Sequence, residues 1–104
     1  NGLAYRALRD CVALCRDAGQ DALAEQCAEA ADRLKAAYVP CLLNPKTGWL
    51  AGWRSRDGEL HDAGYLYATG IAVSLGLIQP DQAREMMGKL EDARIEAGHT
   101  DFTY

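Results

Sequence analysis

The sequence predicts a mainly helical fold in which two antiparallel αα-hairpins are joined by a small β-meander. Four stretches repeat apolar residues with the helical period, and short turn signals separate them in pairs. The stretch 41–62 between the pairs loses that period and carries two turn signals of its own. At 104 residues, with 49% apolar and 25% charged residues, the chain has the size and composition of one small globular domain.

The first hairpin is expected over residues 3–39. The stripe of its first helix, residues 3–18, comprises Ala4, Leu8, Cys11, Val12 and Cys15. The stripe of its second helix comprises Leu23, Cys27, Ala30, Ala31, Leu34 and Tyr38. Gly19 suits the end of the first helix and Asp21 the N-cap of the second. Pro40 is expected to end the second helix, because proline lacks an amide proton.

Residues 41–62 are expected to form a β-loop of two or three short strands. Asn44–Gly48 has the composition of a turn, and Asp57-Gly58 is a second turn signal. Residues 49–54 between the turns look extended, so that Trp49, Ala51 and Trp53 would share one face. So small a sheet is marginal alone and must pack on other elements.

The second hairpin is expected over residues 63–98. Asp62 is placed to cap a helix from Ala63 to Leu75, which is apolar nearly all round and is ended by Gly76. Gly64 and Gly70 would lie inside it, compensated by a closely packed neighbour. Such a helix is normally buried on all sides, and a chain of this length has too few elements to cover it.

The last helix is expected to begin at Pro80, which suits the first helical position, and to end at Gly98. Its apolar stripe comprises Ala83, Met86, Met87, Leu90 and Ala97. Residues 99–104 would start a further segment, in which 101–104 alternate as an extended strand does. Because one helix lacks cover, we expect the chain to be part of a larger assembly, by truncation or by oligomerisation.

Charge and composition exclude several classes of partner. A net charge of −4 argues against nucleic acid, since phosphate binding needs a basic face. The longest uncharged run, residues 63–78, is too short and too rich in glycine for a membrane span. We expect no cofactor and no metal. A zinc site built from Cys11, Cys15, Cys27 and Cys41 lacks the usual paired spacing, and free thiols in a core are the favoured alternative.

The loop carries a family resemblance. The pattern Asn44-Pro-x-Thr-Gly-Trp-x-Ala-Gly-Trp-Arg-x-x-Asp-Gly-x-Leu-His-Asp62, followed by Gly70-Ile-Ala and Gly76-Leu-Ile, resembles a segment of the six-hairpin glycosidases. The resemblance implies about two hairpins of an (α/α)6 toroid of twelve helices. It implies that the whole enzyme is a glycoside hydrolase acting on a carbohydrate, with a phosphorylase as the alternative. This fragment alone would be inactive, and the remainder of the toroid or a second copy would be its protein partner.

The candidate catalytic residue is Asp62. At a helix N-terminus a carboxylate is held ionised, which suits a base or a hydroxyl acceptor rather than an acid. The alternative for Asp62 is a plain N-cap. Trp49 and Trp53 could stack on pyranose rings, or else bury the small sheet.

Four further residues are candidates for substrate binding. His61 could contact a sugar hydroxyl or act as an acid–base group, or else be structural or exposed. Arg54 could hold a hydroxyl or a carboxylate, or else form a surface ion pair with Asp57 or Glu59. Tyr65 would line the same cleft wall, and Asp57 is an alternative carboxylate that a turn would also require. The competing function is a non-enzymatic helical interaction or oligomerisation module, whose apolar helix docks on a partner.

Overall fold

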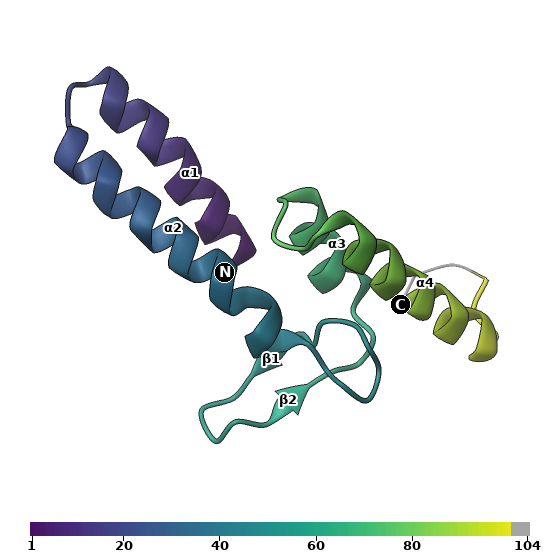
Figure 1. The fold of residues 1–104 in the computed structure, drawn as a ribbon. Coiled ribbons are helices and arrows are strands. Elements are labelled where there is room, and N and C mark those ends of the chain that lie inside the picture. Colours follow the sequence, from purple (N-terminus) through teal and green to yellow (C-terminus); the bar gives the residue numbers. More distant parts are fainter. Residues whose placement is uncertain (101–104) are drawn as a thin grey trace. The chain divides into compact units, whose positions relative to one another are not determined.

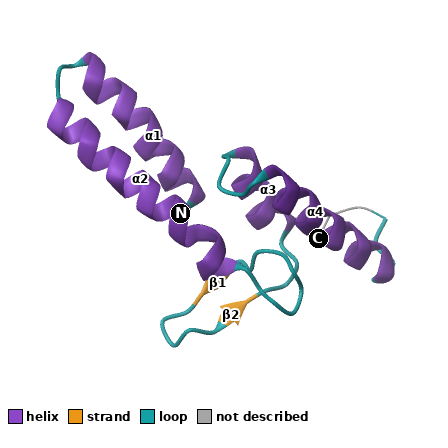
Figure 2. Cartoon of the chain, viewed as in Figure 1, coloured by secondary structure: helices purple, strands orange, loops and turns teal. Residues whose placement is uncertain are grey.

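A computed structural model describes residues 1–100, which form four helices and one two-stranded sheet. The elements are α1 (Gly2–Asp17), α2 (Asp21–Leu42), β1 (Trp53–Arg54), β2 (Leu60–His61), α3 (Leu66–Ser74) and α4 (Pro80–Glu96), shown in Figures 1 and 2. The prediction of a mainly helical chain with a small antiparallel sheet is confirmed. The expected alternation at residues 101–104 lies outside the described residues.

The chain divides into two compact units, Asn1–Tyr38 and a second that begins at Val39. The first unit holds α1 and most of α2, which lie side by side (Figure 1). Gly19 takes a positive φ of 71° between them, as its predicted role at a helix end requires. Asp21 is not a cap but the first residue of α2.

The core of the first unit consists of small side chains. Val12, Cys15 and Ala24 are buried together, with Cys11, Cys27 and Ala28 packed against them. The predicted stripe is correct at Val12 and Cys15. It is wrong at Leu23, which is 47% exposed, whereas its neighbour Ala24 is 1% exposed.

Helix α2 does not end at Pro40, as expected, but continues to Leu42. The amide of Leu43 donates to the Val39 carbonyl at 2.8 Å, and that of Ala51 donates to the Leu42 carbonyl at 2.8 Å. The guanidinium of Arg54 donates to the Cys41 carbonyl at 2.7 Å. The following loop therefore satisfies carbonyl groups of the last turn, which supports the helix beyond its proline.

The loop after α2 forms two short strands, within the two or three expected, but only Trp53–Arg54 of the stretch 49–54 is strand. Trp53 pairs with His61 and Arg54 with Leu60, in a hairpin that turns at Gly58, whose φ is 91°. A single bridge joins Leu43 to Leu50. The three residues expected to share a face do not, since Ala51 is fully buried whereas Trp53 is 50% exposed.

Helix α3 is shorter than predicted and begins at Leu66 instead of Ala63. Gly64 takes a φ of 70°, outside the right-handed helical region, so the helix cannot begin before it. Asp62 is therefore not the N-cap, a position that Tyr65 holds. At the other end Gly76 has a φ of 70°, and its amide donates to the Val73 carbonyl, so its predicted role is confirmed.

The core of the second unit lies between the loop, α3 and α4, which packs against α3. Its buried members are Leu50, Ala51, Thr69, Ala72, Leu77, Ile78, Ala83, Met86 and Leu90. The described chain covers α3 incompletely, since Tyr67 is 58% and Ile71 37% exposed. The position of a Cβ on Gly70 has no atom within 4 Å outside its own helix, so the closely packed neighbour expected there is absent from the described residues.

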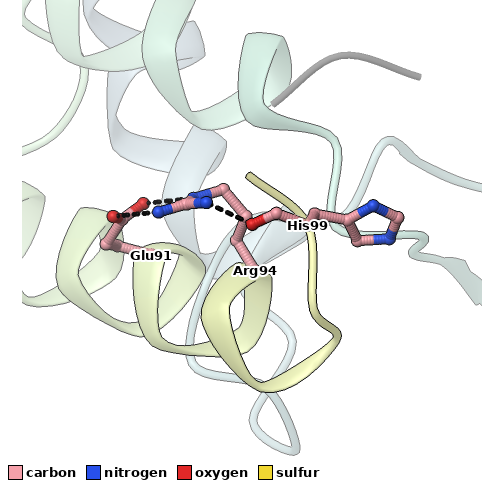
Figure 3. Close-up of polar contacts among 3 residues, drawn as sticks. All are labelled: Glu91, Arg94 and His99. Atoms are coloured by element: carbon pink, nitrogen blue, oxygen red, sulfur yellow. Dashed lines mark hydrogen bonds and ion pairs between the residues drawn. The ribbon is translucent and has the colours of Figure 1, made fainter. Parts of the chain in front are cut away.

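The end of α4 is fixed by an arginine (Figure 3). Arg94 donates Nη2 and Nε to the two carboxylate oxygens of Glu91, at 2.6 and 2.8 Å, and Nη1 to the His99 carbonyl. The same side chain thus holds both the last turn of α4 and the segment that follows it. Within residues 1–100 no helix combines the length and apolar character needed to cross a membrane.

Candidate functional site

The loop between α2 and α3 is organised around the carboxylate of Asp62. Its Oδ1 accepts hydrogen bonds from Trp49 Nε1 and from the amide of Gly64, both at 2.9 Å. Its Oδ2 accepts from Asn44 Nδ2 at 2.8 Å and from Thr47 Oγ1 at 3.0 Å. We call these five residues the Asp62 node. It joins the first turn of the loop, one tryptophan and the start of α3.

The Asp62 node determines what its carboxylate can do. Burial alone raises the pKa of Asp62, but the hydrogen bonds from Gly64, Trp49, Asn44 and Thr47 together outweigh burial and lower it. A carboxylate has about four acceptor positions, and four donors occupy them here. Asp62 is therefore held ionised by these donors, and not by the helix N-terminus that the sequence predicted at this position. In this arrangement it has no remaining position for a substrate hydroxyl.

Four rings form a succession of ring contacts that we call the aromatic ledge: Trp53, His61, Tyr65 and Tyr67. The rings of Trp53 and His61 stack with centroids 4.7 Å apart and planes 11° apart. Tyr65 lies 6.5 Å from Trp53 and 5.6 Å from Tyr67, centroid to centroid. Trp53 is 50% and Tyr67 58% exposed, so the ledge presents aromatic surface to solvent.

The ledge depends on a glycine that carries no side chain beneath the Tyr65 ring. A Cβ on Gly52 would lie 2.9 Å from Cδ2 and 3.0 Å from Cε2 of Tyr65, closer than carbon atoms pack. The Gly52 amide donates to the His61 carbonyl at 2.9 Å, which fixes the backbone at this point. Gly52 thus sets where the Tyr65 ring lies.

Behind the ledge, Ser55 connects His61 to Asp57. Ser55 Oγ donates to Asp57 Oδ1 at 2.5 Å and lies 3.1 Å from His61 Nε2. When the single hydroxyl proton of Ser55 is directed at Asp57 or at the Glu59 carbonyl, the His61 tautomer with a proton on Nε2 donates to Ser55. The hydrogen bonds from Ser55 and from the Glu59 amide lower the pKa of Asp57. This order of contacts holds the turn and does not activate Ser55 as a nucleophile, which would require the histidine to accept its proton.

Arg54 is engaged by backbone carbonyl groups. Its Nε donates to the Cys41 carbonyl and its Nη1 to the Gly58 carbonyl, each at 2.7 Å. It therefore ties the last turn of α2 to the tip of the hairpin, in place of the ion pair with Asp57 or Glu59 that was the alternative from the sequence.

The structure divides the candidates into three groups. Trp53, His61 and Tyr65 come together on the ledge, whereas Trp49 and Asp62 meet in the node. Arg54 and Asp57 hold the hairpin. Sequence reasoning did not select Asn44 and Thr47, whose roles depend on contacts 18 and 15 positions away. It also did not select Ser55, whose partners lie within six positions, or Tyr67, two positions after Tyr65.

The described residues contain no metal-binding cluster. Among residues 1–100 no group of three or more histidine, cysteine or acidic residues is arranged to hold a metal ion. Cys41 is exposed and lies in the second unit, whereas the other three cysteines lie in the first.

Comparison with known protein families, with curated proteins and with solved structures finds no match to this chain.

Proposed function

We propose that this chain is part of a carbohydrate-active enzyme of the six-hairpin glycosidase type and supplies a sugar-contacting wall through the aromatic ledge. The observation that carries the proposal is Trp53, a half-exposed indole that stacks on the His61 ring. An indole face suits the apolar C–H face of a pyranose ring. A supported ring loses little conformational freedom when a ligand binds.

The ledge offers more than one ring. Tyr65 and Tyr67 continue the succession of ring contacts from Trp53, and Tyr67 is exposed. A succession of rings favours a ligand with successive sugar units over a single monosaccharide. The phenol groups and His61 add polar edges for hydroxyl groups.

In this proposal Asp62 is a positioning residue. Glycoside hydrolysis needs two carboxyl groups with separate tasks. The Asp62 carboxylate is already occupied by its four donors. We therefore assign sugar contact to the ledge and loop support to Asp62. In this proposal the node supplies neither of the two carboxyl groups that the reaction needs.

The test is binding of oligosaccharides to the purified chain, followed by tryptophan fluorescence and by amide chemical shifts. A panel of four- to six-unit gluco-, xylo-, chito- and malto-oligosaccharides covers the common ring substituents. We expect one of them to perturb Trp53, and Trp53→Ala to weaken binding about tenfold, equivalent to about 1.4 kcal/mol. Arg56→Ala, in the exposed turn that follows β1, is the matched control and is expected to bind normally.

Two outcomes would contradict the proposal. One is the absence of any shift at the ledge with the whole panel at millimolar concentration. The other is binding that Arg56→Ala and Trp53→Ala weaken equally, which would locate the effect in the turn and not in the ring.

A second candidate function rests on α3. Tyr67 and Ile71 leave apolar surface exposed, which favours a helical interaction or oligomerisation module. This alternative predicts self-association in light scattering, abolished by Ile71→Asp and unaffected by Trp53→Ala. A monomer over the accessible concentration range would remove self-association from consideration.

A further inference from the structure

Three of the four cysteines gather in the core of the α1–α2 hairpin. Cys15 is 8% exposed and buried with Val12 and Ala24, and Cys11 and Cys27 pack against this group. The three thiols lie close enough to influence one another: the pKa of Cys15 is raised by burial and by Cys11 and Cys27, and the pKa of Cys27 is raised by burial and by Cys11. All three are free thiols. Cys11 thus has one sulfur neighbour on its own helix and one on the facing helix.

Helical geometry distinguishes these two neighbours. Cys11 and Cys15 are four residues apart in α1, where Cβ atoms are about 5–6 Å apart. A disulfide needs Cβ atoms about 3.8 Å apart, so that pair could bridge only if α1 were distorted. Cys27 belongs to the facing helix and is free of this restriction. Cys11 and Cys27 are also half-buried, whereas Cys15 is buried, so a reagent in solution reaches the first two more readily.

We propose that the thiol cluster is a redox-sensitive staple, in which a small disulfide oxidant such as oxidised glutathione joins Cys11 to Cys27. The Cys11 thiolate attacks one sulfur of the oxidant, which forms a mixed disulfide and releases one glutathione thiolate. The Cys27 thiolate then attacks the Cys11 sulfur and releases the second. The oxidant gains two electrons, and the two thiol protons end on the two glutathione thiolates.

The consequence of the bond is a covalent tie between α1 and α2. It closes a loop over residues 12–26 and restricts the unfolded chain, which stabilises the hairpin. This stabilisation matters in the first unit because the core there consists of small side chains. The proposal is independent of the carbohydrate contact, since no residue of the aromatic ledge takes part.

The experiment uses the 104-residue chain with Cys41→Ser, which removes the exposed thiol and with it most intermolecular exchange. The folded protein is incubated with oxidised glutathione, blocked and digested. Trypsin leaves Cys11 and Cys15 in one peptide, 10–16, so Cys15→Ala is included to separate them. We expect a disulfide from peptide 10–16 to the peptide with Cys27, a loss of two hydrogen atoms in mass, and a higher midpoint of thermal unfolding.

The variants give opposite expectations. Cys15→Ala should still form the bond, whereas Cys11→Ala and Cys27→Ala should stay fully reduced or carry glutathione. Circular dichroism of the reduced variants checks that each remains helical. The disulfide mapping in the Cys41→Ser protein does not depend on whether these variants fold. A Cys15–Cys27 bond, a bond formed only in denaturant, or an oxidised form that unfolds at lower temperature would overturn the proposal.

Discussion

The α1–α2 hairpin and the loop from Asn44 to Tyr65 are stabilised in opposite ways. In the hairpin, small apolar side chains and thiols form the core, and the Arg6–Asp10 ion pair lies on the surface with side chains 62% and 57% exposed. In the loop, one partly buried carboxylate gathers four donors. Many sequences could build such a hairpin, whereas the loop requires particular residues at particular positions.

The largest expected effect comes from removing the centre of the Asp62 node. Asp62→Ala deprives four donors of their acceptor and should lower the free energy of unfolding of the second unit by about 2–4 kcal/mol. Urea unfolding followed by tryptophan fluorescence measures it, because both tryptophans lie in that unit. Asp57→Ala, in the exposed turn, is the control and should cost much less. Equal losses would mean that the node is not what holds the loop.

Acid should destabilise the loop through Asp62, by a smaller amount than the Asp62→Ala substitution does. The pKa of Asp62 is lowered in the folded chain from its ordinary value of 3.8, so the stability it contributes is fully present above about that pH. This stability is lost as the pH falls further, through the lowered pKa. The effect is smaller than truncation because a protonated carboxyl still accepts hydrogen bonds. In Asp62→Asn this acid-dependent loss of tryptophan-detected stability should be reduced, and an unchanged pH profile would contradict the assignment.

A matched pair of glycine substitutions tests the ledge. Gly52→Ala places a methyl group 2.9 Å from the Tyr65 ring and should destabilise the second unit by about 1–2 kcal/mol. Gly70→Ala meets open space inside α3 and should stabilise it by up to about 1 kcal/mol. Opposite signs in thermal unfolding are the expected result. If Gly52→Ala leaves the stability unchanged and the amide and ring chemical shifts of Tyr65 stay the same, the Tyr65 ring is not held by contact with Gly52.

The smallest effect is expected on the hairpin surface. A double-mutant cycle on Arg6 and Asp10 should give a coupling of about 0.3–0.5 kcal/mol that falls with added salt. The same cycle on Thr47 and Asp62 should give a larger coupling with a weaker salt dependence, since that pair is partly buried. A larger value for the surface pair would reverse the comparison between the regions.

Local patterns predicted the helices and turns well. The helical period located all four helices, and Gly19, Gly58 and Gly76 mark turns or ends with positive φ, as expected. Pro80 is the first residue of α4. These features depend on neighbours a few residues away, so a sequence carries enough information to place them.

The candidate site was less predictable because its contacts are non-local. Asp62 followed by Gly64 resembles a helix cap, yet the carboxylate accepts from Gly64 in a turn and from three residues far upstream. Pro40 predicts the end of a helix from local sequence alone. The donors that support the next turn of α2, such as the Ala51 amide, come from the following loop and are not visible in that local pattern. The carbohydrate function stays a proposal, since its support is the ledge and a resemblance in the loop.

The Asp62 node also bears on the order in which the second unit folds. Its side-chain donors lie 13, 15 and 18 positions before Asp62, whereas the β1–β2 pairs are only 6 and 8 positions apart. Short loops close faster and at lower entropic cost, so the hairpin can form before the carboxylate finds its donors. Once the hairpin has formed, it shortens the loop that must close between the side-chain donors and Asp62. Substitutions in the node should therefore act mainly on the unfolding rate, and those in the hairpin turn on the folding rate.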